Sequence, residues 1–144
     1  MARPTTRRGS QLLIKLHDGG SSPDVLVAPC ALTTKAFNRS AAVNEFNVGD
    51  CDDPDAAIWT ERVKSALSST ISGSGTLAKE SLSLYESFFA EADPRAIQIT
   101  VNWTTGPVVY QGNYIMTTLN VTGEQDGLIQ VELEFQSSGE VVEV

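Results

Sequence analysis

The feature that most constrains the fold is the last third of the chain, where strand-like segments follow one another almost without interruption. Residues 96–104 and 128–136 alternate apolar and polar side chains, and residues 108–121 form one long segment between them. A period of two is typical of strands that bury one face and expose the other. Gly106-Pro107 and the polar residues 123–127 separate the segments and predict turns. The chain is therefore expected to be mainly β.

Shorter strand signals lie elsewhere in the chain. The same alternation predicts a strand over residues 12–17. A hairpin is expected within residues 33–48, and a bend centred on residues 38–41 would place Lys35 opposite Glu45, a pair worth about 0.2–1 kcal/mol. Further strands are expected at residues 25–27, 68–74 and 141–144.

Two segments carry helix signals. An apolar stripe at helical spacing predicts a helix from about 79 to 92, which Asp93-Pro94 ends. A shorter helix is expected from about 54 to 66, because Asp53 suits an N-cap, Pro54 suits the first helical position, and apolar residues follow at helical spacing. One solid flanking helix beside many strands indicates a β-sandwich or a partly closed barrel.

The length of the chain fits one domain. Its 144 residues can bury a core without a disulfide or a metal. No apolar run approaches the roughly 20 residues of a membrane-spanning helix. Residues 11–144 are expected to form the domain, preceded by a flexible basic arm over residues 1–10. No apolar region follows the arginines of this arm, so it is not expected to be a secretory signal, and both cysteines are expected to stay reduced.

Charge is distributed unevenly along the chain. The formal net charge is −8, from 10 Lys and Arg against 18 Asp and Glu. Residues 1–8 carry Arg3, Arg7 and Arg8 and no acid, whereas the rest hold 7 basic and 18 acidic groups, a balance of −11. This balance argues against tight binding to nucleic acid through its phosphates. The basic arm is either a solvated terminus or a segment that docks on the acidic surface of a neighbouring copy.

Residues 50–61 hold the densest group of carboxylates. Counted from Asp50, Glu61 falls at position 12 of a calcium-binding EF-hand loop, but Pro54 stands at position 5 and Asp55 at position 6, where that loop needs glycine. The single histidine and the serines lack the motif of a hydrolase nucleophile, and no phosphate-binding loop is present in the sequence. The sequence therefore predicts no enzyme, no metal site and no cofactor.

The segment 108–116 carries no charge at all, although exposed strand edges are usually blunted by lysine, proline or bulges. This segment is either central in its own sheet, or the edges of the sheet pair with neighbouring copies and build a ring.

Several short motifs follow one another in a characteristic order. They are an opening strand, a polar hairpin at 32–48, an acidic loop leading to Ile58-Trp59-Thr60-Glu61, then Thr70-Ile71-Ser72-Gly73-Ser74-Gly75, Leu84-Tyr85 within the helix, Tyr110-Gln111-Gly112-Asn113-Tyr114-Ile115, and Leu133-Glu134-Phe135-Gln136-Ser137-Ser138-Gly139. In this order, over residues 10–140, they resemble the major tail tube proteins of long-tailed phages and of phage-like gene transfer agents.

The resemblance implies a β-sandwich with a flanking helix, assembled as a hexameric ring whose inner sheets join into a continuous barrel. Stacked rings would form a tube that conducts DNA without binding it, with tail terminator, distal tail and tape-measure proteins as partners. The protein would be made in the bacterial cytoplasm and reside in the tail of a virion or gene transfer agent particle, without insertion into a membrane.

Within that picture, two groups of residues become candidates for assembly and conduction. Acidic side chains on polar strand faces are candidates for the lumen or its rim: Glu45, Glu132 and Glu134. The candidates for ring stacking and contacts between subunits are Arg3, Arg7, Arg8, Lys35, Asp50, Asp52, Asp53 and Asp55. The basic arm of one copy would pair with the acidic segment of a copy in the neighbouring ring.

Two other readings stay open from the sequence. One is the tube of a contractile injection or secretion device, which shares the ring architecture. The other is a monomeric β-barrel that binds a small ligand between its sheet and its helix.

Overall fold

The computed structural model describes residues 3–17, 26–29 and 32–144, and over these residues the chain has eight strands and one α-helix. In chain order the elements are a 3-10 turn at Gly9–Gln11, β1 (Leu12–His17), β2 (Leu26–Val27), β3 (Leu32–Val48), β4 (Trp59–Thr76), α1 (Lys79–Ala90), β5 (Arg95–Trp103), β6 (Gly106–Thr122), β7 (Gln130–Ser137) and β8 (Val142–Glu143). In the described part of the chain, no helix has the length and apolar character needed to cross a membrane.

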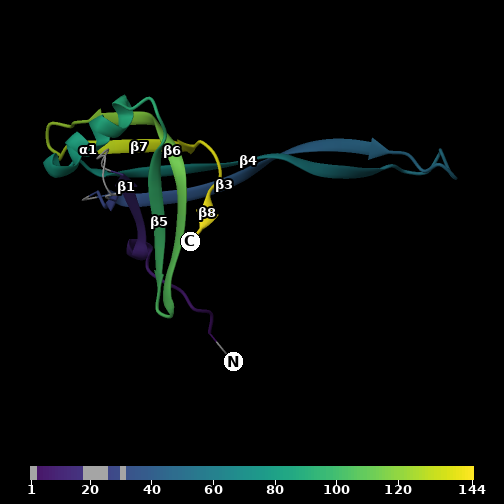
Figure 1. Cartoon of the computed structure of the whole chain (residues 1–144), viewed down its shortest axis with the longest axis horizontal. Coiled ribbons are helices and arrows are strands. Elements are labelled where there is room, and N and C mark those ends of the chain that lie inside the picture. Colours follow the sequence, from purple (N-terminus) through teal and green to yellow (C-terminus); the bar gives the residue numbers. More distant parts are fainter. Residues whose placement is uncertain (1–2, 18–25, 30–31) are drawn as a thin grey trace.

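All eight strands belong to one open antiparallel sheet in the order β2-β1-β5-β6-β7-β4-β3, with β8 paired to β6. The long strand β6 connects the two halves of this sheet. Its first half, Gly106–Tyr114, pairs with β5, and its second half, Tyr114–Thr122, pairs with β7. In Figure 1 the β5–β6 part therefore crosses the direction of β7, β4 and β3. The predicted mainly β fold with one flanking helix is confirmed.

The core lies between one face of this sheet and α1. Tyr85 and Phe88 of the helix are buried, and the Phe88 ring meets Phe135 of β7 edge to face at 5.2 Å. Alternate positions of the strands complete the core with Ile14, Leu16, Ile71, Ile97, Ile99, Tyr114, Met116, Val131 and Leu133. The predicted helix is confirmed as Lys79–Ala90, and its apolar stripe packs on the sheet as expected.

Most other sequence-predicted elements are found, with longer boundaries in several cases. β1, β5 and β7 match the strands expected from the alternation, β6 and β8 match the strands expected at 108–121 and 141–144, and β4 contains the strand expected at 68–74. The short strand near 25–27 is seen as β2, whereas Val25 lies outside the described residues.

Residues 32–76 differ most from the prediction. The expected hairpin within 33–48, with its bend at 38–41, is wrong: β3 runs unbroken through those residues and pairs along its length with β4. The expected short helix at 54–66 is also wrong, because residues 59–66 are strand and the chain turns at 49–58. The physical reason is that the spacing of four between Trp59 and Val63 suits one face of a helix and one face of a strand equally, and pairing with β3 decides for the strand.

The β3–β4 hairpin extends far beyond the rest of the sheet (Figure 1). Pairing of β4 with β7 stops at Thr70, but pairing with β3 continues to Trp59. We call residues 41–67 the arm. Ser65 is an extra residue in β4 within the arm, because Ala42 faces Ala66 while Val43 faces Lys64. A one-residue bulge of this kind exchanges the two faces of the strand that contains it.

Candidate assembly surfaces

One face of the arm is apolar and has no partner among the described residues. Register places Phe46, Val48, Trp59 and Val63 on this face, together with Glu61. Their exposed fractions are 52%, 57%, 88% and 56%, respectively. Contiguous exposed apolar side chains of this kind mark a surface that contacts another molecule. The arm therefore presents a binding face that the isolated chain cannot bury.

Towards the tip, the opposite face of the arm carries polar side chains that bond to one another, whereas nearer the main sheet it carries the exposed Val43 and Leu67. The Arg62 Nε donates to Glu45 Oε1 at 3.0 Å, and Thr60 Oγ1 donates to Asn47 Oδ1 at 2.9 Å. Glu45 therefore pairs with Arg62 across the hairpin. The predicted pair of Glu45 with Lys35 is wrong, because Lys35 lies opposite Gly73, in the part of β3 that belongs to the main sheet.

The tip of the arm is an acidic turn. The Asp52 backbone N–H donates to Asp50 Oδ1 at 2.9 Å, and the Ala56 N–H donates to the Asp53 carbonyl at 3.1 Å. Asp53 and Pro54 thus begin a tight turn instead of a helix. Asp50, Asp52, Asp53 and Asp55 are all exposed. Among the described residues, no group of three or more His, Cys, Asp or Glu side chains is placed to hold a metal ion.

The root of the arm, by which we mean residues 38–40 and 68–69 next to the arm, is held by polar groups around the buried Ser69. The Tyr114 hydroxyl donates to Ser69 Oγ at 2.8 Å, and Ser69 Oγ donates to the Asn38 carbonyl at 3.0 Å. The Ser69 N–H donates to Ser137 Oγ at 2.9 Å. The root is therefore tied to β6, β3 and β7 together. Burial raises the pKa of the Tyr114 hydroxyl above its usual range, partly offset by the Ser69 hydrogen bond and by the nearby positive charge of Arg39.

Arg39 lies at the same root, over a pair of aromatic rings that contact each other. Its guanidinium carbon is 5.1 Å from the Phe37 ring centre and 5.0 Å from that of Tyr110, and these two rings are 5.5 Å apart. Cation–π contacts of this geometry fix the direction of an arginine side chain. The motif Tyr110-Gln111-Gly112-Asn113-Tyr114 is visible in the sequence, but nothing in the sequence identifies Arg39 or Ser69 as the partners of its two tyrosines.

Gly112, in the middle of that motif, lies under the C-terminal segment. A Cβ at this position would stand 2.8 Å from Val141 Cγ2 and 3.3 Å from the Glu140 carbonyl oxygen. No side chain fits in that space without moving the segment, so the glycine lets residues 140–141 cross β6 closely. The C-terminal segment in turn forms one wall of a groove beside the root of the arm.

The face of the sheet away from the core is polar along β4, β7 and the second half of β6. Glu132 lies opposite Ser74 and Asn120, and Glu134 lies opposite Ser72 and Thr118. Ser72, Ser74, Thr118 and both glutamates line a shallow depression. The structure thus brings together two of the three candidates for the lumen. Glu45 lies on the arm, away from them.

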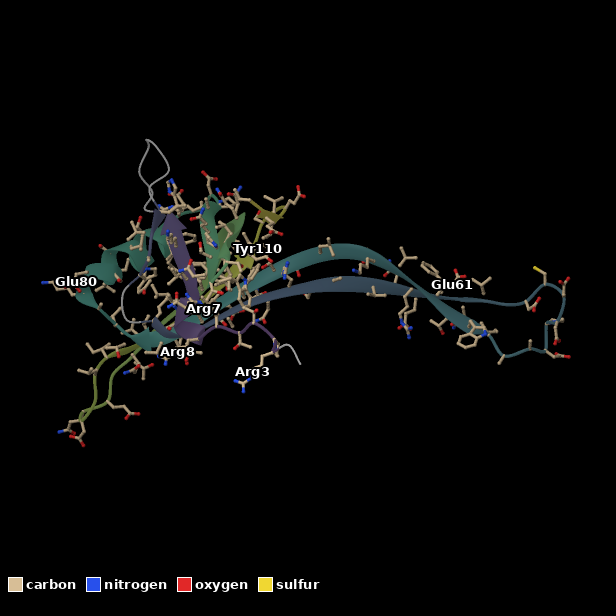
Figure 2. The ribbon with its side chains drawn as sticks, turned by 90° about the horizontal axis from the view of Figure 1, so that it is seen from below. Arg3, Arg7, Arg8, Glu61, Glu80 and Tyr110 are labelled. Atoms are coloured by element: carbon tan, nitrogen blue, oxygen red, sulfur yellow. The ribbon has the colours of Figure 1, made fainter. Side chains whose placement is uncertain are left out.

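The N-terminal arginines lie beside the main sheet, away from the tip of the arm. The Arg7 Nε donates to the Asn102 carbonyl at 2.7 Å, which fastens the start of the chain to the end of β5. Figure 2 shows Arg3, Arg7 and Arg8 near the body, whereas Glu61 lies far out on the arm. Any pairing of these arginines with Asp50–Asp55 therefore joins two different copies of the chain.

We call β3, β4, β7 and the second half of β6 the polar half-sheet. Two strand edges of this half-sheet are unpaired in the described structure. β3 is the last strand of the sheet on one side, and its outer edge has no partner strand. The second half of β6 pairs with β7 on one edge, and its pairing with β5 ends at Tyr114. Long open edges of this kind favour pairing with another chain.

Comparison with known families and structures gives a consistent result. Residues 6–143 match the family model described as phage tail tube protein. No curated protein matches the sequence. The fold is similar to a chain in the tail of an empty gene transfer agent particle refined with C6 symmetry, with a TM-score of 0.75, 21% identity, and coverage of 96% of this chain and 99% of the other.

Two further structures share the fold. A chain in the virion of a native gene transfer agent particle has a TM-score of 0.75 at 20% identity, covering 96% of this chain and 99% of that one. The SPP1 tail tube has a TM-score of 0.69 at 8% identity, covering 94% and 77%. Identities this low establish a common fold, and the family is given by the match over residues 6–143.

Proposed function

This chain belongs to the phage tail tube protein family and has a structural role in a tail, and on that premise we propose that six copies close into a ring and that rings stack into a tube. The C6 symmetry of a related gene transfer agent tail supports the number of copies. The observation that carries the proposal is the arm, whose apolar face, including Trp59 at 88% exposure, needs a second copy to cover it.

Ring closure is proposed to occur by strand pairing between copies. Within the polar half-sheet, β3, β4, β7 and β6 alternate in direction, so each copy contributes four antiparallel strands. Rotation about the ring axis keeps strand direction relative to that axis, so β6 of one copy would lie antiparallel to β3 of the next. The open edges of β3 and of Tyr114–Thr122 in β6 would then pair.

The polar face with Glu132 and Glu134 is proposed to face the lumen. Joining the half-sheets of successive copies in a ring would give a barrel with two faces. One is the core face, which α1 covers, and the other is the face without the helix, which carries Glu132 and Glu134. Carboxylates repel the phosphates of DNA, whereas lysine or arginine would bind them. A lumen lined in this way lets a DNA duplex slide through the tube.

The arm is proposed to connect successive rings, because it continues β3 and β4 far beyond the rest of the sheet (Figure 1), and these strands would run along the proposed barrel. Contacts of Arg3, Arg7 and Arg8 with Asp50–Asp55 of a neighbouring copy would add to this stacking. Lys35 would contribute from β3, beside the ring-closing edge. Glu45 belongs to this stacking element, since it lies on the arm.

Tail terminator, distal tail and tape-measure proteins are the further partners that we propose for the tube. The protein would be made in the bacterial cytoplasm and function in the tail without catalysis. Tubes of contractile injection devices are a less favoured reading, and a monomeric ligand-binding barrel does not account for an arm with an exposed apolar face.

The test is electron microscopy and analytical sedimentation of the purified full chain over a range of concentrations. Rings or tubes with six-fold symmetry are expected as the concentration rises. A monomer that persists at high concentration, without rings or tubes, would refute the proposal.

A further inference from the structure

The groove at the root of the arm has both basic and apolar walls. Arg39, Lys64 and Leu67 line it from the hairpin, and Glu140 and Val141 line it from the C-terminal segment. Leu67 is 76% exposed. No ion-pair partner of Arg39 or Lys64 is present in the part of the chain that the structure describes. The groove therefore offers two cations without an ion-pair partner, against the one carboxylate of Glu140, beside an exposed apolar side chain.

Three of the seven basic residues beyond residue 8 lie on this face of the hairpin: Arg39, Arg62 and Lys64. Because Arg62 is paired with Glu45, Arg39 and Lys64 are the ones available to a partner. In a domain that is strongly acidic elsewhere, this is a distinct site for a segment that combines acidic and apolar side chains.

The loop between β6 and β7 has that composition. Glu124 and Asp126 are exposed, and the Gly127 N–H donates to the Glu124 carbonyl at 3.2 Å, which holds them in a tight turn. Leu128 and Ile129 follow directly and are 70% and 52% exposed. The loop thus presents two carboxylates beside two apolar side chains.

The loop and the groove lie at opposite ends of β7. The loop precedes Gln130 at the start of the strand, and the groove includes Ser137 at its end. Eight residues of strand separate them by about 25 Å. A loop therefore cannot reach the groove of its own copy, but when two copies stack in the same orientation, the loop end of one meets the arm end of the other.

We propose that the loop 123–129 of one copy docks in the groove of the copy in the adjacent ring, with Glu124 and Asp126 facing Arg39 and Lys64. Leu128 would cover Leu67. This contact rests on the proposed function, and it identifies the groove as the surface on which the loop of the adjacent ring docks. It is heterologous, since two different surfaces meet, and repeated stacking therefore builds an open tube in which all rings have the same orientation.

The test is charge reversal in the full chain. Lys64→Glu is expected to raise the concentration needed for tubes by roughly tenfold or more at low salt. Combining it with Glu124→Lys and Asp126→Lys in one chain is expected to restore tubes. Mixing rings of Lys64→Glu with rings of the loop variant is expected to restore them too, because alternating rings then pair opposite charges at every junction.

The control reverses charge at the tip of the arm. Asp52→Lys with Asp53→Lys should not rescue Lys64→Glu, and rescue by this pair would overturn the proposal by assigning the groove to the arm tip. Normal tubes from Lys64→Glu would also overturn it, as would failure of the loop variant to restore assembly when both variants show a wild-type circular dichroism spectrum and melting temperature.

A cross-linking measurement separates this contact from the proposed function. With Cys30 and Cys51 replaced by serine, a chain carrying Leu67→Cys and Leu128→Cys is expected to form disulfide-linked chains of two or more copies. If this chain folds like the wild type and forms the cross-links but no ring, the result would refute the proposed function and support the contact. Tubes that form without these cross-links would refute the contact alone.

Discussion

Truncation of Trp59 on the arm gives the sharpest test of whether the arm holds the tube together. Trp59 is 88% exposed, so Trp59→Ala should change the free energy of unfolding of the monomer by no more than about 0.5 kcal/mol. A tryptophan buries about 150–250 Å² when covered. At about 25 cal/mol per Å², covering the exposed share would contribute roughly 3–5 kcal/mol for each arm. Assembly should therefore suffer while folding does not.

The assay is the critical concentration for tube formation, measured by sedimentation and checked by electron microscopy. A loss of roughly 3 kcal/mol raises that concentration at least ~100-fold, and several arms in each ring increase the effect. Phe89→Ala is the matched control, because Phe89 is 52% exposed on the outer side of α1 and lies outside the arm. Tubes from Trp59→Ala at the wild-type concentration would refute the argument that the apolar face is covered by a neighbouring copy.

Three further changes test the root of the arm, the C-terminal segment and the lumen. Tyr114→Phe removes a buried hydrogen bond and should lower the free energy of unfolding by about 1 kcal/mol in urea denaturation. Folding raises the pKa of Tyr114, so the contribution of its neutral hydroxyl to the free energy of unfolding is complete at neutral pH. That contribution is lost as the pH rises from about 10, the unfolded pKa, through the higher pKa of the folded state. Gly112→Ala should cost about 1–3 kcal/mol and displace Val141 from β6. Glu132→Lys with Glu134→Lys should make tubes retain DNA, with binding that weakens as salt rises.

Each of these changes has an outcome that would contradict its reasoning. Wild-type stability of Tyr114→Phe would show that the hydroxyl is dispensable, and an equal alkaline loss in this variant would assign that loss to other groups. Unshifted resonances of Glu140 and Val141 in the nuclear magnetic resonance spectrum of Gly112→Ala would contradict the close approach. Tubes that carry both lysines and still do not bind DNA would place these residues outside the lumen. Glu132→Gln with Glu134→Gln is the matched control for that pair.

The parts of the fold set by local pattern were predictable from the sequence. Strict alternation located β5 and β7, and the apolar stripe with Asp93-Pro94 located α1, because burial of a single face imposes those periods. The hairpin was not predictable from the same patterns. Its outer part buries no face within the chain, so its composition carries no alternation set by a core.

The candidate site shows the same division. Glu132 and Glu134 could be placed on a common polar face, because a period of two leaves no other choice once Leu133 is in the core. Arg39 could not be assigned, since its aromatic neighbours Phe37 and Tyr110 come from strands about 70 residues apart in sequence. Contacts between distant strands depend on sheet order, which local sequence does not encode.

The bulge at Ser65 marks the one position of β4 where the arm can lose a residue without changing which side chains share a face. In β3 the face that is polar in the main sheet continues into the arm as the face of Phe46 and Val48, and the bulge brings Trp59 and Val63 of β4 onto the same side. Deleting this one serine would remove the bulge and keep the register, because Val63 would still face Asn44 and Trp59 would still face Val48. A frame-preserving loss of that codon would thus keep the binding face whole, whereas the loss of one codon from residues 60–62 would turn Trp59 to the opposite side.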